Sequence, residues 1–463
     1  MNNKPNILFF FTDDQRYDTI AALGNEEINT PNLDSLVQKG TSFTRAHIPG
    51  GTHGAVCMPS RAMLHTGRTL FHLENSGRQI PGEHKMLGEV LQKAGYQTFG
   101  TGKWHNGTKS YARSFNNGAE IMFGGMGDHW NVKACDYDPT GEYRGSKIIN
   151  EPYRDNTVTR RLCDHIKCGK HSSELFCEAS TEWLKKYDSQ DPFFMYISFM
   201  APHDPRSMPE NFLNMYNPDK ISLPDNFQDE HFDFGVKNIR DEVLADYPRD
   251  KKEVKKHISE YYAMISHLDY ELGKVIEVLK QKGEYENTII IFAGDNGLAV
   301  GRHGLMGKQN NYEHSIRVPL IFSGPGIPEN EKRDNYVYLY DIFPTICEMI
   351  GLEIPDSVEG KSLTQVIKNK DKETRDYLYF AYESKVRAIK GDRYKLIVYN
   401  TEEGTKKQLF DLANDPQEMN NLYGKIDYKE VEEKLKEIMI KYKKQWDDEE
   451  HPTGEKFWSE VQL

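Results

Sequence analysis

Short apolar runs that end in polar residues are the feature that most restricts the fold of this 463-residue chain. The clearest runs are Asn6 to Phe11, Phe193 to Phe199, Thr288 to Phe292 and Val318 to Phe322. They alternate with amphipathic segments, a pattern typical of parallel strands that helices cover. The sequence therefore predicts an α/β protein with a large, mostly parallel central sheet flanked by helices on both faces.

Two amphipathic segments predict covering helices. Residues Lys256 to Lys282 carry apolar side chains near helical spacing, and Gly283 follows as a stop signal. A second apolar pattern lies near residues 335–351 and is broken by Pro355. The stretch 202–250 is rich in Pro, Asp and Asn, which predicts loops over the edge of the sheet.

The last ninety residues predict a smaller domain. Tyr377 to Ala381 and Arg393 to Tyr399 have the composition of strands in a separate antiparallel sheet. Tyr428 to Trp446 is rich in Lys and Glu and predicts a helix. We therefore expect a large domain over residues 1–374 and a smaller C-terminal α+β domain over residues 375–463, with an antiparallel sheet and a helix.

Polar residues follow three of the predicted strands. Asp13 and Asp14 follow the first, His203 the second, and Asp295 and Asn296 the third. The carboxyl ends of parallel strands meet at one sheet edge, where open α/β sheets bind ligands. Hard divalent cations prefer oxygen ligands of this kind, although either acidic pair alone fits a helix cap or a tight turn equally well. Two such pairs after buried strands favour a metal site.

Composition bears on the binding partners and the cellular location of the protein. The chain has 59 Lys and Arg against 71 Asp and Glu, a formal charge of −12, which argues against a broad nucleic-acid-binding face. Six cysteines in so long a chain form no disulfide framework and fit a reducing compartment. The apolar stretch Ile7 to Phe11 is too short for a signal peptide or a membrane span. We expect a cytoplasmic protein, or a periplasmic or secreted one if a signal peptide was removed, with no membrane and no nucleic-acid partner.

The run Cys57-Met58-Pro59-Ser60-Arg61 carries the strongest chemical signal. Proline favours the first position of a helix, so the motif predicts a cysteine at a helix N-terminus, where backbone N–H groups collect anions. A nucleophile for an anionic ester would lie there. The alternative is a buried structural thiol.

Continued to Leu64-His65-Thr66-Gly67-Arg68, this run resembles the signature of the type I, formylglycine-dependent sulfatases of the alkaline phosphatase superfamily. Further matching segments are Gly102 to His105, Ala201 to His203, Gly301 to Lys308, Tyr312-Glu313 and Arg317 to Ile321. The resemblance covers roughly residues 5–325. It implies that residues 1–374 form a sulfatase catalytic domain that hydrolyses sulfate esters.

The resemblance also implies the site residues. Cys57 would be oxidised to formylglycine by a maturation enzyme, and one Ca²⁺ would be held by Asp13, Asp14, Asp295, Asn296 and modified residue 57. Arg61 would orient the hydrated side chain, Lys103 and Lys308 would hold sulfate oxygens, and His105 and His203 would move protons. His203 is our choice for protonating the leaving alcohol, although the two histidine roles could be exchanged.

The expected substrate is a small sulfated saccharide, such as one derived from a glycosaminoglycan, cleaved from a chain end. An arylsulfatase, or a phosphate or phosphonate ester hydrolase of the same superfamily, remains open. So does a non-catalytic sulfated-glycan-binding protein with unmodified Cys57. Candidates for holding a second acidic group of the substrate are Arg16, Arg68, Arg78, Lys109, Arg113, Arg206 and Arg302.

One further cluster could suggest zinc. Cys163, Cys168 and Cys177 lie close in sequence to His165 and His171. Their spacing is not that of a known zinc finger, so we expect ordinary reduced thiols.

Overall fold

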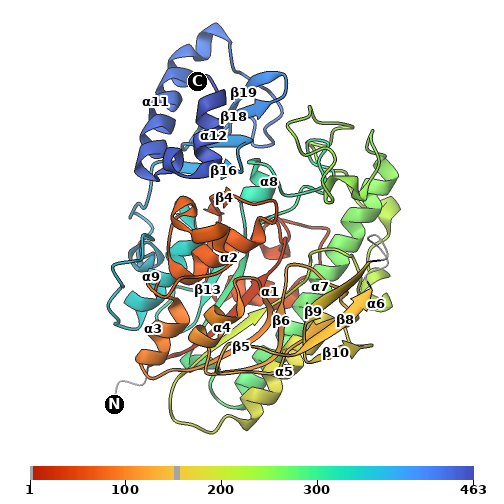
Figure 1. Cartoon of the computed structure of the whole chain (residues 1–463), viewed down its shortest axis with the longest axis vertical. Helices are drawn as coiled ribbons and strands as arrows, with labels where there is room; N and C mark the ends of the chain where they lie inside the picture. The colour runs from red at the N-terminus through yellow and green to blue at the C-terminus, as the bar shows by residue number, and fades with distance from the viewer. Residues whose placement is uncertain (1–3, 151–156) are drawn as a thin grey trace.

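The computed structural model describes residues 4–150 and 157–463. An eight-stranded sheet lies at its centre, in the order β14-β2-β13-β12-β1-β11-β5-β6 (Figure 1). Its strands are β1 (Asn6–Thr12), β2 (Gly40–Phe43), β5 (Gln97–Trp104), β6 (Asn117–Phe123), β11 (Phe193–Ser198), β12 (Thr288–Gly294), β13 (Leu320–Ser323) and β14 (Glu331–Arg333).

The predicted α/β class with a mostly parallel sheet is confirmed. β1 pairs in parallel with both β11 and β12, and β5 pairs in parallel with β11 and β6. The predicted strand at Val318 to Phe322 exists as β13, but it is antiparallel to β12 and to β2. The connection of residues 295–319 includes α8 (Glu313–Ile316) and is long enough for a parallel crossover, so its length does not set the direction of β13.

Side chains of β1 alternate between two apolar cores. Ile7, Phe9 and Phe11 pack on one face of the sheet, in the core that includes residues of helix α2 (Cys57–Thr66) and of the C-terminal sheet. Leu8 and Phe10 pack on the other face, together with long helices. Successive side chains of a strand point to opposite faces, so a run apolar at every position is buried from both sides.

The helices that cover these faces include the predicted ones. The other α-helices are α1 (Pro31–Gln38), α3 (Leu87–Lys93), α4 (Thr108–Ser114), α5 (Ser172–Lys186), α6 (Glu210–Leu213), α7 (Lys251–Gln281), α8 (Glu313–Ile316), α9 (Ile342–Met349), α10 (Thr364–Lys368), α11 (Lys429–Gln445) and α12 (Pro452–Glu460). α7 is the predicted long helix and begins five residues earlier, where Asp250 caps it by accepting from the N–H groups of Lys252 and Glu253. The helix predicted near 335–351 is only α9, because β15 (Val337–Tyr338) precedes it.

Strands β5 and β6 were not predicted, although β5 carries Lys103. Gly100 and Gly102 interrupt its apolar pattern, and the pairing with β6 shifts register between Thr101 and Gly102. Gly102 has φ +86, and a Cβ there would lie 1.9 Å from the carbonyl oxygen of Ser198. The glycine therefore permits a close approach to β11 that a side chain would block.

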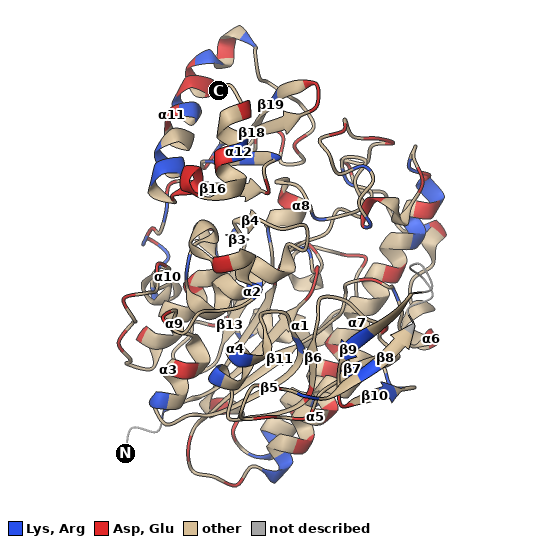
Figure 2. Cartoon of the chain, viewed as in Figure 1, with Lys and Arg blue, Asp and Glu red and all other residues tan. Residues whose placement is uncertain are grey.

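The C-terminal residues form an antiparallel sheet of β16 (Leu378–Tyr382), β17 (Val386–Lys390), β18 (Tyr394–Thr401) and β19 (Gly404–Asp411). A fifth strand comes from far earlier in the chain, because β4 (Gly50–Gly51) pairs in parallel with β16. Lys and Arg alternate with Asp and Glu along α11, which covers this sheet (Figure 2). The two parts of the chain thus share a sheet just ahead of α2.

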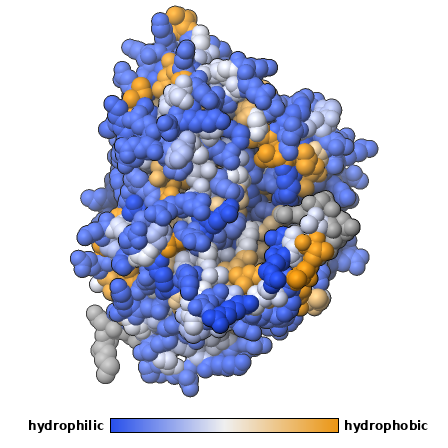
Figure 3. All heavy atoms as spheres, in the orientation of Figure 1, coloured by the Kyte–Doolittle hydropathy of each residue, from blue (hydrophilic) through white to orange (hydrophobic). Residues whose placement is uncertain are grey.

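Three small ribbons complete the described strands. They are β3 (Ala46–His47) with β15, β7 (Asn131–Ala134) with β10 (His165–Cys168), and β8 (Ser146–Asn150) with β9 (Val158–Leu162). The face turned to the viewer in Figure 3 is mostly hydrophilic, with apolar side chains in separate patches. Among the described residues, no helix combines the length and the apolar character needed to cross a membrane.

Helix α2 is buried along its whole length. It begins at Cys57, so Pro59 is its third residue rather than its first as predicted. Proline fits there because the first turn of a helix has N–H groups without intrahelical partners. On its inner side His65 packs on Trp104 and Tyr196, with ring centroids 4.5 and 5.0 Å apart.

This packing predicts a pH-dependent stability. Burial, with a contribution from Arg61, lowers the pKa of His65 to about 3, whereas the unfolded value is about 6.5. The unfolded chain therefore binds the extra proton first, and stability falls as pH drops below 6.5. In the wild type, His65 should lower the free energy of unfolding by up to about 1.4 kcal/mol for each pH unit below 6.5. We expect His65→Phe to abolish this contribution, as measured by urea unfolding between pH 7 and 5.

His72 provides the opposite control. A hydrogen bond to Glu359 raises its pKa, so its stabilisation is present below pH 6.5 and is lost as pH rises through the folded value. His72→Phe should therefore lower stability more at pH 5 than at pH 8. If the free energy of unfolding of His65→Phe depended on pH as strongly as that of the wild type, the neutral, buried state of His65 would be contradicted.

Candidate active site

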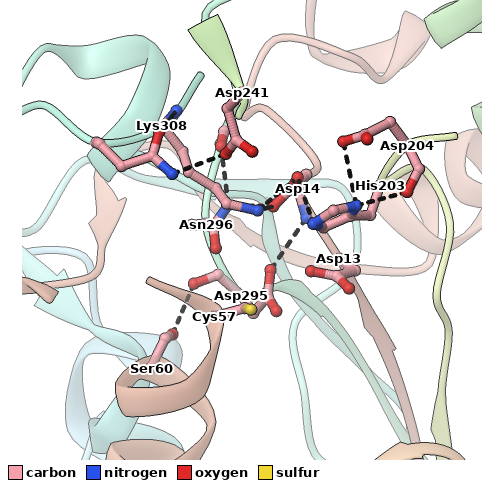
Figure 4. A network of polar contacts seen from close by, with 12 residues as sticks. Asp13, Asp14, Cys57, Ser60, His203, Asp204, Asp241, Asp295, Asn296 and Lys308 are labelled. Carbon is pink, nitrogen blue, oxygen red and sulfur yellow. Dashed lines mark hydrogen bonds and ion pairs between the residues drawn. The ribbon is translucent and has the colours of Figure 1, made fainter. Parts of the chain in front are cut away.

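The predicted site residues come together at the carboxyl edge of the central sheet. Figure 4 shows seven of them: Asp13, Asp14, Cys57, His203, Asp295, Asn296 and Lys308. Asp13 and Asp14 follow β1, and Asp295 and Asn296 follow its neighbour β12. Lys103 is near the end of β5, with His105 directly after it, and Cys57 and Arg61 belong to the first turns of α2. His203 follows β11 by five residues, and Lys308 comes from the loop between β12 and α8. Segments far apart in sequence thus meet in one place, as the parallel arrangement predicts.

Three buried carboxylates form the centre of the site. The backbone N–H of Asp14 donates to Asp295 Oδ1 at 3.0 Å, and Asn296 Nδ2 donates to Asp14 Oδ1 at 2.6 Å. Burial and the neighbouring carboxylate of Asp13 raise the pKa of Asp295 to about 7. Burial opposes ionisation of Asp13 as well, but Lys103, His203 and Arg61 lower its pKa below the usual range. Mutual repulsion is therefore built into this cluster.

The donor set fits a hard divalent cation. Asp13 Oδ1 and Asn296 Oδ1 are buried and have no hydrogen-bond donor among the described residues. Buried acceptors are normally satisfied, so an orphan pair needs an explanation. A cation bound by these oxygens would supply it and would relieve the repulsion. Metal-ligand groupings found among the described residues are Asp13 with Asp14 and His203, and Asp13 with Cys57 and Asp295.

Three cations surround the carboxylates. Arg61 Nε and Nη2 lie 2.9 and 2.8 Å from Asp295 Oδ2, and its Nη1 donates to Ser198 Oγ at 2.5 Å. Lys308 Nζ donates to both oxygens of Asp14, at 2.6 and 2.7 Å, and Lys103 Nζ pairs with Asp13. All three side chains are almost fully buried. Each carboxylate of the centre is therefore paired with a buried cation.

Cys57 lies close to Lys103 and His105. Its Sγ is 3.5 Å from Lys103 Nζ and 3.5 Å from His105 Nδ1. Burial raises the pKa of the thiol to about 11 despite the lowering effect of Lys103. The thiol is therefore buried, as the structural alternative expected. Its neighbours are nevertheless predicted site residues.

The two histidines have different surroundings. Burial lowers the pKa of His105 well below 6.5, and Lys103 and Arg61 add to the effect. This ring is neutral near pH 7. His203 Nδ1 donates to the carbonyl oxygen of Asp204 at 2.7 Å, and its Nε2 lies 3.6 Å from Asp14 Oδ2. A donor bond at Nδ1 directs Nε2 toward the carboxylates.

A cavity of about 540 Å³ opens onto these residues. Cys57, His105, His203 and Lys308 line it. Apolar lining residues include Met122, Phe123, Val132, Leu162 and Met200. Polar and charged lining residues include His53, Asp128, Lys133, Arg161, Arg240, Asp241, Gln309, Glu383 and Lys385. The cavity size falls within the range of small-molecule sites.

The cations proposed from sequence to hold a second acidic group do not line this cavity. Among the described residues, the lysines and arginines that line it besides Lys308 are Lys133, Arg161, Arg240 and Lys385. Arg16 and Arg302 both pair with Asp18, and Arg113 pairs with Glu89. Position along the chain does not reveal which long cationic side chains already have partners, so this set was wrong.

Several site residues escaped the sequence analysis. Asp241 accepts from Gln309 Nε2 at 2.7 Å, and Arg240 pairs with both Asp204 and Asp241. Ser60 Oγ donates to the carbonyl oxygen of Asp295 at 2.6 Å. Asp204 and Asp241 belong to the 202–250 stretch, whose composition indicated loops over the site edge without marking any single residue.

The cysteines considered for zinc lie apart from this centre. Cys163 and Cys177 are buried and Cys168 is exposed, and all three are free thiols. His165 pairs with Glu120, and His171 caps α5 by accepting from the N–H of Ser173. Neither metal-ligand grouping found among the described residues includes any of these five.

Comparisons with known proteins decide the family. The Sulfatase family model matches residues 5–352, three quarters of the chain. The chain belongs to the sulfatase family. A second model, N-sulphoglucosamine sulphohydrolase, C-terminal, matches residues 301–445. The predicted membership of the type I sulfatases, and with it sulfuric ester hydrolysis, is confirmed.

Two curated relatives illustrate the range of this family. An arylsulfatase of Clostridium perfringens is 30% identical, over 95% of this chain and 94% of the relative. An N-acetylglucosamine-6-O-sulfatase of Bacteroides thetaiotaomicron is 26% identical, over 96% of this chain and 87% of the relative. The match therefore extends through the C-terminal residues.

Solved structures share the fold. A structure described as a complex with its substrate D-glucosamine-2-N,6-O-disulfate has a TM-score of 0.77 and 22% identity, covering 98% of this chain and all of that one. A phosphonate monoester hydrolase of Agrobacterium radiobacter has a TM-score of 0.75 and 21% identity, covering 96% of each chain. At these identities the likeness concerns the fold alone.

Proposed function

We propose that this sulfatase hydrolyses the sulfate ester of a small saccharide with a nucleophile made from Cys57. One observation carries the proposal. Cys57 is the first residue of a buried helix, lines the cavity, and has Lys103 Nζ and His105 Nδ1 each 3.5 Å from its sulfur. Helix N-termini and lysines both attract anions, so a sulfate group is drawn to the residue that attacks it.

An unmodified thiol suits this reaction poorly, since its sulfur adduct would persist. We infer that a maturation enzyme oxidises Cys57 to formylglycine. The hydrated aldehyde then supplies one hydroxyl that attacks sulfur and a second whose deprotonation expels sulfate and restores the aldehyde. The alcohol of the substrate leaves in the first step and sulfate in the second, so atoms and charge balance without water attacking sulfur.

Calcium fits the acidic centre as the cofactor. Asp13, Asp14, Asp295 and Asn296 would hold it together with modified residue 57, through oxygen atoms that such a hard ion prefers. When bound, it would lower the pKa of a coordinated hydroxyl and offset negative charge. Asp13 Oδ1 and Asn296 Oδ1, which accept no hydrogen bond from the described residues, support this assignment.

The remaining residues handle charge and protons. Lys103 and Lys308 hold sulfate oxygens, and Arg61, fixed by Asp295 and Ser198, orients residue 57. Neutral His105 accepts the proton of the second hydroxyl. His203, held at Nδ1 by the Asp204 carbonyl, delivers a proton to the leaving alcohol from Nε2. A sugar alcohol is a poor leaving group, which makes that proton important.

Relatives support a carbohydrate substrate. They include the N-acetylglucosamine-6-O-sulfatase and an ulvan-active sulfatase of Formosa agariphila, 28% identical over 93% of this chain. A partly enclosed cavity of about 540 Å³ suits a sugar at the end of a chain better than the middle of a polymer. We therefore favour an exo-acting enzyme on glycosaminoglycan-derived or similar saccharides.

The test compares ester classes on protein co-expressed with a maturation enzyme. Sulfate release is measured from defined sulfated mono- and disaccharides and from 4-nitrophenyl sulfate, and phosphate release from 4-nitrophenyl phosphate. We expect at least one saccharide to surpass both aryl esters in kcat/KM. Faster cleavage of the phosphate than of every sulfate would instead support a phosphate ester hydrolase, and mass spectrometry of the Cys57 peptide establishes whether the aldehyde is present.

A further inference from the structure

The turn between β16 and β17 in the C-terminal sheet reaches the catalytic cavity. Glu383 and Lys385 both line the cavity there, and neither contacts the acidic centre through a hydrogen bond or ion pair of the described residues. The proposed mechanism gives them no task. Their place in the cavity wall is therefore unexplained by sulfate cleavage itself.

The turn is held in a fixed position relative to the nucleophile. The N–H of Glu383 donates to the carbonyl oxygen of Gly51 at 2.8 Å, where β16 and β4 pair. The carbonyl oxygen of Lys385 accepts from the N–H of Asn400 at 2.8 Å. Gly51 precedes Cys57 by six residues. A side chain on this turn is thus positioned against residue 57 by backbone bonds, as a specificity contact requires.

Glu383 also has an unfavourable backbone conformation. Its φ is +40, in the left-handed region that glycine and asparagine tolerate better than glutamate. Strain of this kind persists where the surrounding structure enforces it and is concentrated at functional sites. The turn would be easier to form with glycine, so the glutamate side chain has another purpose.

The pair presents both kinds of hydrogen-bonding group to the cavity. Lys385 Nζ pairs with Glu383 Oε2, and the side chains are 28% and 27% exposed. Glu383 Oε1 has no hydrogen-bond partner among the described residues and lies beside Gly54, three residues before Cys57. Apolar side chains, among them Met122 and Phe123, line the same cavity. The cavity therefore offers apolar surface to ring carbons as well as polar groups to the ring substituents.

We propose that Glu383 and Lys385 form a subsite for two neighbouring hydroxyl groups of the sugar, an inference that rests on the proposed saccharide sulfatase function. The carboxylate accepts a hydrogen bond from one hydroxyl, and the ammonium group donates to the oxygen of the next. A hydroxyl group can donate to the carboxylate and accept from the ammonium group, so it matches either member of the pair. Because the pair carries no net charge, it gives no anchor to a second sulfate or carboxylate.

The experiment combines protein variants with deoxygenated substrates. The probes are the methyl glycosides of glucose 6-sulfate, N-acetylglucosamine 6-sulfate and glucuronic acid 2-sulfate, which all have free hydroxyls at positions 3 and 4, and their 3-deoxy and 4-deoxy forms. In Glu383→Ala and Lys385→Ala we expect kcat/KM for the best probe to fall about tenfold to a hundredfold, mainly through KM, as expected for a lost charge-assisted hydrogen bond. The penalty for deoxygenation should disappear in the same variants. Cleavage of 4-nitrophenyl sulfate should change less than twofold.

Two further variants separate recognition from folding. Glu383→Gly relieves the positive φ, so we expect an equal or higher Tm together with the same tenfold to hundredfold fall in kcat/KM for the saccharide. Glu403→Ala breaks a similar pair, in which Glu403 Oε2 lies 2.7 Å from Lys406 Nζ on the β18–β19 hairpin, outside the cavity. It should leave all rates unchanged.

Each contrary result has a distinct meaning. Equal losses on aryl and saccharide sulfates, or a marked fall of Tm in Glu383→Gly, would make the pair a structural clasp and overturn the inference. Turnover of 4-nitrophenyl sulfate without turnover of any saccharide probe would also overturn it. If the wild-type protein with an aldehyde at residue 57 cleaves no sulfate ester, the proposed function itself fails.

Discussion

Replacing Cys57 with alanine is expected to abolish sulfate release, whereas Cys57→Ser should permit at most one turnover per molecule. Alanine has no nucleophilic atom next to Lys103 and His105. Serine can attack sulfur, but its single hydroxyl leaves a sulfate ester that has no second hydroxyl to expel it. The measurement is the stoichiometry of alcohol and sulfate released in a rapid-mixing assay, with mass spectrometry of the residue 57 peptide for an increase of one sulfate.

Matched controls make this result specific. Cys177→Ala and Cys347→Ala remove other buried thiols outside the cavity and should keep turnover while costing stability through lost packing. A Cys57→Ser protein that continued to turn over would contradict the aldehyde mechanism. A wild-type protein that is active with an intact thiol would contradict it as well.

Removing divalent cations is expected to have the second largest effect. Chelation should eliminate activity and lower the Tm, because the carboxylates of Asp13, Asp14 and Asp295 then repel one another in a buried site. Added Ca²⁺ should restore both. At free calcium a hundredfold above Kd, binding stabilises the folded state by about 2.7 kcal/mol, which a thermal-shift titration detects.

The variant Asp13→Asn tests where the ion binds. It removes one charge of the central cluster while keeping an oxygen at the same position, so we expect the calcium-dependent Tm shift to decrease strongly. Asp392→Asn is the control, because Asp392 pairs with Arg45 at the exposed surface. A full calcium response in Asp13→Asn, or full activity after exhaustive chelation, would contradict a calcium site at this position.

The strand-end residues could be predicted because they depend on local patterns. Asp13 and Asp295 directly follow runs that are apolar at every position, and such runs form central parallel strands whose carboxyl ends share an edge. Lys103 was assigned by resemblance, although β5 itself was missed. The glycines of β5 interrupt the apolar pattern by which a strand is predicted. Only the structure shows that the Ser198 carbonyl leaves no room for a side chain at Gly102.

Other contacts left no signal in the sequence. β4 contains two residues, too few for any periodic pattern, yet it joins β16 more than three hundred residues later. Asp241 and Arg240 come from a loop whose composition marks it only as irregular. Glu383 belongs to a hairpin that the sequence assigned to a separate domain, and its contact with the cavity depends on the pairing of β16 with Gly51.

The sequence by itself determined the α/β class, the strands that end in carboxylates, and the cysteine helix, because periodicity and short motifs act over a few residues. Only the tertiary structure decided that β13 runs antiparallel, which cations already have partners, and which side chains line the cavity. These features arise from packing between segments far apart in the chain, where geometry and burial select among many cations and carboxylates that look equivalent in the sequence.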